Sequence, residues 1–266
     1  MSVVLLLIAL YLALGLLSGL LAGLLGIGGG LVMVPALAVL LPRQGVPAAV
    51  LMQVAVATSL ACIAATGISS ALAHARRGGV DRRALLQLVP GLGLGAGGGA
   101  WIGHAMSSDL LKRVFAVSLM LLALQMLRGA RKAATGQLPP APVTGAVGVG
   151  IGISSALLGV GGGSLMVPYL ARFGLEMRRA VGTSAAAGVP IAWAAALNYM
   201  WAGRAVAGLP EWCLGYVFLP AAGLIALASV STAPLGARLA HALPTATLKR
   251  VFAALLMVVG LSMLVH

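Results

Sequence analysis

Charged residues are scarce in this chain. Asp, Glu, Lys and Arg together make up 8% of its 266 residues, whereas hydrophobic residues make up 61%. A soluble globular domain carries roughly 25% charged residues, which cover its water-facing surface, so this composition excludes an ordinary soluble protein. Several uncharged apolar runs reach or approach about 20 residues, the length at which a helix crosses a bilayer: 3–25, 114–127 and 180–200. The sequence therefore predicts an all-α polytopic membrane protein.

Acidic residues are rarer still. The chain has four, Asp81, Asp109, Glu176 and Glu211, and all of them fall in predicted loops or at the ends of predicted spans. Proton pumps and antiporters usually relay protons through buried Asp, Glu or His side chains. The sequence therefore argues against an intramembrane carboxylate relay, although it leaves open a proton carried on a substrate itself.

Cysteine and histidine are too sparse for a disulfide framework or a metal site. Cys62 and Cys213 both fall inside predicted spans. His74 borders a basic loop, and His104 and His241 lie near span ends, where anchoring at the membrane interface is the expected role. Because no carboxylate cluster accompanies these histidines, we predict neither a metal ion nor a cofactor.

Basic residues are the exception to this scarcity, since 17 Lys and Arg give a formal net charge of +13. In a soluble protein such an excess would suggest nucleic acid, but here the basic residues lie between apolar runs, where they set topology and contact anionic head groups. We therefore expect membrane lipid as a partner and no nucleic acid. The first apolar run has no Lys or Arg before it and exceeds the apolar region of a signal peptide, so we expect a retained helix.

Glycine is abundant, and its densest stretch occurs twice. The segment from Gly19 to Pro35 recurs at an offset of 133 residues as the segment from Gly152 to Pro168. The match continues, because Thr58-Ser59 pairs with Thr183-Ser184, and 99–116 matches 236–253. We therefore predict one integrated transmembrane domain of two homologous halves, 1–133 and 134–266, joined by a proline-rich linker at about 129–142.

Each half has the same predicted order of elements. A long apolar helix leads to the glycines, a short helix follows at 31–41 or 164–173, and three spans complete the half. The predicted spans are 48–73, 84–105 and 111–128 in the first half, and 180–202, 211–234 and 248–265 in the second. A helix of 10 or 11 residues rises only about 16 Å, which is too short to cross alone. Whether each long and short pair is re-entrant or makes two full crossings stays open at this point.

The basic residues also predict the orientation. If each long and short pair returns to its starting side, only four basic residues lie outside: Arg43, Lys112, Arg113 and Arg204. If the pair crosses once instead, the two sides carry nearly equal numbers. The positive-inside rule favours the first arrangement, in which both termini face outward and equivalent spans run in opposite directions. The sequence thus predicts an inverted repeat, a construction typical of alternating-access transporters.

The duplicated glycines are too dense for a continuous helix. An unwound segment frees backbone N–H groups, and the helix that follows presents the positive end of its dipole, so two such ends can hold an anion without a charged side chain. Tight helix packing is the alternative use of glycine, and it is the expected use of Gly91, Gly93, Gly95 and Gly97. The candidate binding residues of the two loops are Gly28, Gly29, Gly30, Leu31, Gly161, Gly162, Gly163 and Ser164.

Polar side chains inside the apolar spans form a second set of candidates. Their hydroxyls and amides can donate to an oxyanion, although Ser and Thr in membrane helices more often bond to a carbonyl one turn earlier or to a neighbouring helix. The candidates are Thr58, Ser59, Thr183, Ser184, Gln53 and Asn198.

The ordered set of motifs resembles a known family across almost the whole chain. The twice-occurring Gly-x-Gly-Gly-Gly with a following Pro, the two Thr-Ser pairs and the basic segment 76–81 are similar to those of the sulfite exporter family TauE/SafE. The resemblance implies a permease of the bacterial inner membrane that carries small sulfur-containing anions, such as sulfite or organosulfonates, and typically exports them. It assigns binding to the two glycine loops and the Thr-Ser pairs. Because Ser164 stands where the first loop has Leu31, the two halves cannot bind symmetrically.

A transporter for a small anion is therefore the leading functional hypothesis, in which the anion enters a basic-rimmed inner vestibule, settles between the glycine loops and is released by rocking of the halves. Two other classes stay open. A non-transporting membrane scaffold would need no central site, and an intramembrane serine hydrolase would use Ser184 or Ser69 with a histidine base. We expect no enzyme activity. Helices rich in small residues would permit a homodimer without requiring one.

Overall fold

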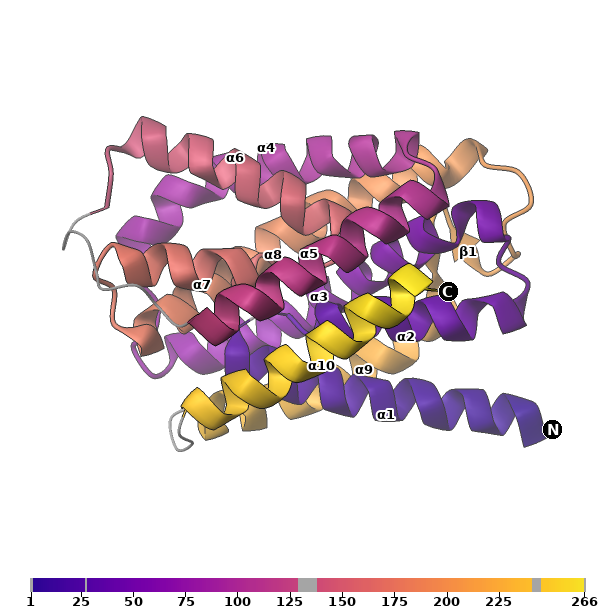
Figure 1. Ribbon diagram of the computed structural model, residues 1–266, viewed down its shortest axis with the longest axis horizontal. Coiled ribbons are helices and arrows are strands. Elements are labelled where there is room, and N and C mark those ends of the chain that lie inside the picture. Colours follow the sequence, from indigo (N-terminus) through magenta and orange to yellow (C-terminus); the bar gives the residue numbers. More distant parts are fainter. Residues whose placement is uncertain (1, 27, 129–137, 241–244, 266) are drawn as a thin grey trace.

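The computed structural model describes residues 2–26, 28–128, 138–240 and 245–265, which form an elongated bundle of helices (Figure 1). The first five helices are α1 (Ser2–Leu25), α2 (Gly30–Leu40), α3 (Leu51–Ala75), α4 (Arg82–Ala105) and α5 (Ser108–Arg128). The next five are α6 (Ala141–Leu157), α7 (Gly163–Arg172), α8 (Met177–Ala202), α9 (Leu219–Leu239) and α10 (Thr245–Val265). Short 3₁₀ turns at Leu41–Gln44, Ala48–Val50 and Gly203–Ala205, and a hairpin of β1 (Cys213–Leu214) and β2 (Val217–Phe218), connect them.

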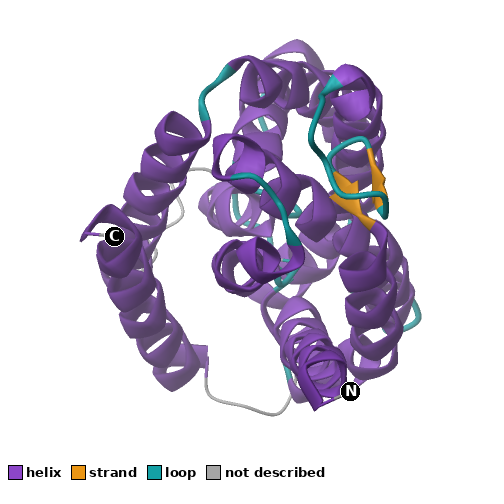
Figure 2. Cartoon of the chain, turned by 90° about the vertical axis from the view of Figure 1, so that its right-hand side faces the viewer, coloured by secondary structure: helices purple, strands orange, loops and turns teal. Residues whose placement is uncertain are grey.

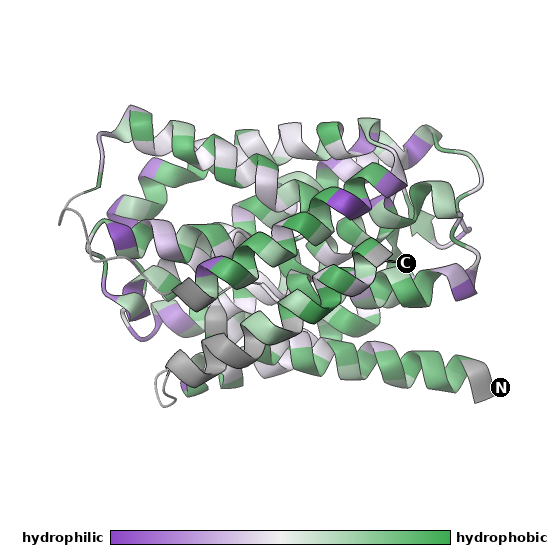
Figure 3. Cartoon of the chain, in the orientation of Figure 1, coloured by the Kyte–Doolittle hydropathy of each residue, from purple (hydrophilic) through white to green (hydrophobic). Residues whose placement is uncertain are grey.

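The described helices include several with the length and apolar composition of membrane-spanning helices. Five of them are long and apolar enough to cross one, at Val4–Leu24, Ala48–Ala75, Arg82–Ala105, Met177–Ala205 and Leu219–Leu239. Figure 3 shows that apolar residues cover the length of the bundle, whereas hydrophilic residues gather at its two ends. The predicted all-α, multi-pass membrane fold is confirmed.

Most predicted helix boundaries agree with the structure to within three residues, and the two short helices, α2 and α7, agree to within one. The predicted span 211–234 is wrong at both ends. Glu211 to Phe218 carry the β1–β2 hairpin, in which Cys213 pairs with Phe218 around a turn where Gly215 has φ +55°. Helix α9 therefore begins only at Leu219, with Pro220 in its first turn, where the missing N–H of proline costs nothing.

The predicted linker at about 129–142 extends two residues too far at its C-terminal end. Ala141 and Pro142 are already the first residues of α6, whose N-cap is Pro140. A helix tolerates proline in its first turn because the N–H groups there have no intrahelical acceptor. Residues 129–137 of the linker lie outside the described residues, as does His241.

Helices α1 and α2 form a hairpin. A Cβ atom on Gly29 would lie 2.6 Å from the carbonyl oxygen of Ser18, and the amide of Gln44 donates to the hydroxyl of Tyr11. Helix α2 therefore runs antiparallel to α1. The pair begins and ends at the same end of the bundle, which is the return to the starting side that the charge distribution favoured.

The outer helices pair crosswise. Helix α1 packs most extensively on α9, and α4 packs most extensively on α6. If helices are matched by their order in the two halves, α1 corresponds to α6 and α4 corresponds to α9. The α1–α9 contact and the α4–α6 contact are therefore equivalent: each joins the first helix of one half to the fourth helix of the other half. Helix α5 packs mainly on α10, and this pair lies against α2 and α3.

Glycine stripes allow the crosswise pairs to approach closely. Gly15 of α1 faces Ile225 of α9, where an added Cβ would lie 2.6 Å from the carbonyl oxygen. Gly91 and Gly95 of α4 meet the backbone of α6 in the same way, so their predicted packing role is confirmed. Gly93 has open space around its Cβ position, and Gly97 faces the Asn198 amide instead.

Helices α3 and α8 lie antiparallel in the centre of the bundle and are the most deeply buried of the candidate spans. Gly67 of α3 faces Val189 of α8, whereas His74, about two helical turns further along α3, faces Gly182. These two equivalent helices thus run in opposite directions. Figure 2, viewed from one end, shows that α1 begins and α10 ends at the same end, which also carries the β1–β2 hairpin.

Candidate functional site: two crossing glycine loops

Both glycine stretches are unwound, as predicted. Gly28 and Gly29 have φ of +82° and +73° in the first loop, and Gly159 and Gly162 have φ of +61° and +76° in the second. Residues with a Cβ atom rarely adopt this left-handed conformation, so glycine is needed at these positions. Helices α2 and α7 begin directly after the N-caps Gly29 and Gly162, one residue earlier than predicted.

The two loops touch each other at the centre of the protein. A Cβ atom on Gly28 would lie 3.2 Å from the nitrogen of Gly161 and 3.1 Å from the side chain of Ile63, and one on Gly30 would overlap the carbonyl oxygen of Gly159. Ile63 lies halfway along α3, and Gly188, which contacts Gly161, lies near the middle of α8. The loops therefore cross at mid-length of the two central helices.

The start of α7 presents free donors at this crossing. The carbonyl of Gly162 accepts from the N–H groups of Leu165 and Met166, whereas the N–H groups of Gly163 and Ser164 have no acceptor among the described residues. The first N–H groups of a helix carry the positive end of its dipole. The hydroxyl oxygen of Ser164 is buried and also lacks a partner within the described part of the chain.

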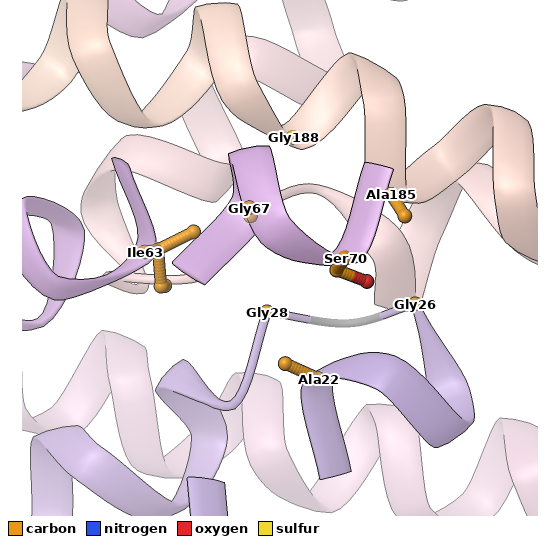
Figure 4. A pocket seen from close by; sticks show the side chains of 9 residues that line it. Ala22, Gly26, Gly28, Ile63, Gly67, Ser70, Ala185 and Gly188 are labelled. Carbon is orange, nitrogen blue, oxygen red and sulfur yellow. The ribbon is translucent and has the colours of Figure 1, made fainter. Parts of the chain in front are cut away.

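A cavity of about 10 Å³ lies beside the crossing. This volume is about that of one water-sized probe, so an oxyanion would fit only after the surrounding elements move apart. One polar side chain faces it, that of Ser70, whose buried hydroxyl has no partner among the described residues (Figure 4). The lining residues are Ala22, Gly26, Gly28, Ile63, Gly67, Ser70, Gly161, Ala185 and Gly188.

The two predicted serines of the Thr-Ser pairs hold the glycine loops. Ser59 of α3 donates to the carbonyl of Gly159 at 2.8 Å, and Ser184 of α8 donates to the carbonyl of Gly26 at 3.4 Å. Each serine thus bonds the loop of the opposite half. In this structure each serine hydroxyl donates its proton to a backbone carbonyl, so it cannot donate to a ligand at the same time.

The two threonines act in a matching way. Thr58 accepts from the N–H of Phe218 at 3.0 Å, and Thr183 accepts from the N–H of Asp81 at 2.8 Å. Phe218 and Asp81 are the N-caps of α9 and α4. All four duplicated hydroxyls therefore make hydrogen bonds between the two halves, and we call these four bonds the cross-half pins.

The predicted amide candidates lie away from the crossing. Gln53, in the first turn of α3, donates to the carbonyl of Met106 at 2.7 Å. Asn198, near the end of α8, accepts from the indole N–H of Trp101 at 3.0 Å and donates to its own helix. The structure does not bring these two side chains to the glycine loops.

The sequence interpretation missed two serines near the loops, Ser70 and Ser155. Ser155 is completely buried, and its unpartnered hydroxyl oxygen lies 3.4 Å from the Cβ position of Gly162. Under the offsets of the repeat their counterparts are Ala195 and Ala22, so a search for duplicated polar residues passes over both. A serine doublet, Ser69-Ser70 or Ser154-Ser155, is the sequence signal that was available.

The end of the bundle where α3 ends and α4 and α8 begin is basic. Arg179 forms an ion pair with Asp81 at 3.0 Å, and the Asp81 carboxylate also caps α4 by accepting from the N–H of Ala84. His74 borders this loop, as predicted, because it lies in the last turn of α3, where its ring is buried and lies 3.0 Å from the carbonyl of Gly23. His104 lies at the other end, 2.9 Å from the Tyr216 hydroxyl.

The two serines considered as nucleophiles are engaged with backbone carbonyls. Ser184 donates to Gly26, and Ser69 donates to Val230 at 2.9 Å. A hydrolase nucleophile instead needs a base as its hydrogen-bond acceptor. This geometry disfavours the hydrolase alternative.

Comparison with known proteins agrees with the fold. The family described as Sulfite exporter TauE/SafE matches residues 11–263. A probable membrane transporter protein of Haemophilus influenzae is 37% identical over 240 residues, which cover 90% of each chain. A probable membrane transporter protein of Methanocaldococcus jannaschii is 27% identical over 245 residues, covering 90% of this chain and 88% of the relative. One of Bacillus subtilis is 32% identical over 165 residues, covering 55% and 60%.

No solved structure matches the chain significantly. The family match nevertheless spans both halves and includes both glycine loops, the cross-half pins and the basic segment 76–81. The chain therefore belongs to the sulfite exporter TauE/SafE family.

Proposed function

We propose that this protein is a membrane transporter of the bacterial inner membrane that exports small sulfur-containing anions, such as sulfite or organosulfonates. Membership of the TauE/SafE family and the names of the relatives support transport. The single observation that carries the proposal is the contact of Gly28 with Gly161 at mid-length of α3 and α8. Broken helices that meet at the centre of the membrane are typical of transporter binding sites.

The anion binds at this crossing without a charged side chain. No Asp, Glu, Lys or Arg lines the cavity in the described residues. A charged side chain at the bilayer centre is costly, whereas helix N-termini and hydroxyl groups supply partial positive charge from groups that the fold already places there. The donors on hand are the first N–H groups of α2 and α7 and the hydroxyls of Ser70 and Ser164.

Transport proceeds by alternating access. The cavity of about 10 Å³ is too small for an oxyanion, so the elements around it must move apart when the anion binds. The antiparallel pair α3 and α8 and the crosswise pairs α1–α9 and α4–α6 support an inverted repeat, in which the same motion in either half opens opposite ends. The basic end faces the cytoplasm by the positive-inside rule, so its arginines attract the anion before export.

Flux of radiolabelled sulfite in proteoliposomes tests the proposal. Saturable flux that follows an imposed potential of either sign is expected, because an anion leaving the cell gains about 2.3 kcal/mol per charge per 100 mV of inside-negative potential. A panel of competing sulfonates, sulfate and chloride then ranks the substrates. Absence of flux for every sulfur-containing anion would rule out the proposed substrate class and favour a scaffold.

A matched pair of variants connects the flux to the crossing. Ser70→Ala removes the one polar side chain that the described residues contribute to the cavity and should slow sulfite flux, whereas Ser69→Ala removes a neighbouring, exposed hydroxyl that is bonded to Val230 and should leave flux unchanged. Equal flux from both variants would place the anion elsewhere.

A further inference from the structure

Two neighbouring serines of α6 have different surroundings. Ser154 is exposed and donates to the carbonyl of Gly150 at 2.9 Å, one turn earlier in its own helix. Most Ser and Thr hydroxyls in apolar helices are satisfied in this way. Ser155 makes no such bond and has no partner among the described residues, although it is completely buried. A buried hydroxyl without a partner is unfavourable unless a ligand or water satisfies it.

Ser155 faces the start of α7. Its hydroxyl oxygen lies 3.4 Å from the Cβ position of Gly162, the N-cap of that helix. The N–H groups of Gly163 and Ser164 follow directly, and neither has an acceptor in the described part of the chain. The buried hydroxyl of Ser164 is likewise unpartnered there. Side-chain and backbone donors from α6 and α7 are thus left over at one helix N-terminus, which is a favourable place for an anion.

The first half lacks these side-chain donors. At the offset of 133 residues, Ala22 corresponds to Ser155 and Leu31 corresponds to Ser164. Both are buried and apolar. The first half therefore has methyl and isobutyl groups at the two positions where the second half has hydroxyls.

We propose that a small oxyanion is held on one side of the crossing, by the hydroxyls of Ser155 and Ser164 and by the N–H groups at the start of α7. On the opposite side Ala22 and Leu31 of the first half supply no side-chain donor, so that, among the described residues, only the N–H groups at the start of α2 remain there. This assignment rests on the proposed function for the identity of the cargo, but the site itself requires only a ligand with several acceptor oxygens. Ser155 is the binding residue that the duplication pattern concealed.

Ser155→Ala and Ser154→Ala form the test pair. Removal of the Ser155 hydroxyl leaves no polar group without its partner, so the fold should be unaffected. Loss of one hydrogen bond to an anion should weaken binding about tenfold or more. Ser154→Ala removes the adjacent, exposed hydroxyl and should leave binding unchanged. Ser164→Ala should weaken binding by a similar factor to Ser155→Ala.

Binding is measured on purified full-length protein as the rise of its thermal unfolding midpoint with sulfite, sulfate, phosphate or chloride, and the KM for sulfite is measured in proteoliposomes. We expect at least one oxyanion to stabilise the wild type and Ser154→Ala at concentrations that leave Ser155→Ala unchanged. The site is refuted if no anion of the panel stabilises the wild type, or if Ser155→Ala responds as the wild type does.

The two proposals fail in different ways. Sulfite flux with the same KM in the wild type and Ser155→Ala would overturn the one-sided site and leave the transport function standing. Stabilisation by sulfate or phosphate that Ser155→Ala loses, without flux of any sulfur-containing anion, would support the site and overturn the proposed substrate class.

Discussion

The cross-half pins predict that a single conservative substitution weakens the contact between the halves. Thr183→Val keeps a side chain of similar shape but removes the oxygen that accepts the N–H of Asp81 at 2.8 Å. Thr183 is completely buried, so water cannot replace the lost acceptor from that side. The partly exposed carboxylate of Asp81 continues to cap α4 and to pair with Arg179, so the ion pair is not the group that changes.

The magnitude follows from the fate of the N–H group. A hydrogen bond contributes about 0.5–1.5 kcal/mol net, and a buried donor left without a partner costs about 1–3 kcal/mol. Hydrogen bonds between membrane helices have measured contributions of about 0.6 kcal/mol on average and at most about 1.7 kcal/mol. We therefore expect Thr183→Val to lower the free energy of unfolding by about 1–2 kcal/mol.

The assay is reversible unfolding in detergent or bilayer, with Ser231→Ala as the control. The Ser231 hydroxyl donates at 2.7 Å to Ala228 of its own helix, so its removal should change the free energy of unfolding by less than about 0.5 kcal/mol. Thr58→Val, which removes the acceptor of the Phe218 N–H, should cost about as much as Thr183→Val. Equal stability of Thr183→Val and Ser231→Ala would refute the pin interpretation.

Three further predictions concern packing, exposure and charge. Gly95→Ala should destabilise the protein by at least about 1 kcal/mol in thermal unfolding, because the added Cβ would overlap the carbonyl oxygen of Val149 in α6. Gly93→Ala places its Cβ in open space and should be neutral or slightly stabilising. Burial raises the pKa of the Cys213 thiol to about 11, so alkylation at pH 8.5 should be on the order of a hundredfold slower than for an ordinary thiol and should rise with pH up to about 11; a fast reaction at pH 8.5 would contradict this. Arg76→Ala should slow anion flux without changing the order of competing anions, because a loop charge steers an anion and does not select it; a changed order would place Arg76 in the site.

The features that the sequence predicted well are those that depend on neighbouring residues in the chain. The glycine loops and the two short helices were found to within one residue, because a run of glycines destabilises a helix wherever it occurs and proline and apolar residues mark the restart. The helices at both ends of each loop needed no information from distant residues. The exception was α9, where a two-residue hairpin around Gly215 interrupts an apolar stretch that reads as helix.

What the sequence could not predict is the identity of hydrogen-bond partners. Ser59 bonds a carbonyl 100 residues away, and Thr58 bonds an N–H 160 residues away. Duplication indicated that the Thr-Ser pairs have a role. A hydroxyl can bind a ligand or form a hydrogen bond to a backbone group of another helix, and only the fold distinguishes these two roles. The same limit explains Ser155, whose importance lies in the absence of a partner among the described residues.

The positions of the cross-half pins connect the fold to the proposed transport cycle. Thr183 and Ser184 lie in the part of α8 nearest the basic end, and Thr58 and Ser59 lie in the part of α3 nearest the opposite end, so each end of the closed structure has two pins. In the proposed cycle, opening of the basic end separates α8 from Asp81 and Gly26 while the pins at the other end stay formed, and opening of the other end breaks the equivalent pins of Thr58 and Ser59. The basic end also has the Arg179–Asp81 ion pair between the two halves, so the two ends are not held by identical sets of bonds. Thr183→Val should therefore favour the state open at the basic end, and Thr58→Val the state open at the opposite end, as measured by the side from which each variant binds sulfite. Preference of both variants for the same side would contradict this division of the pins.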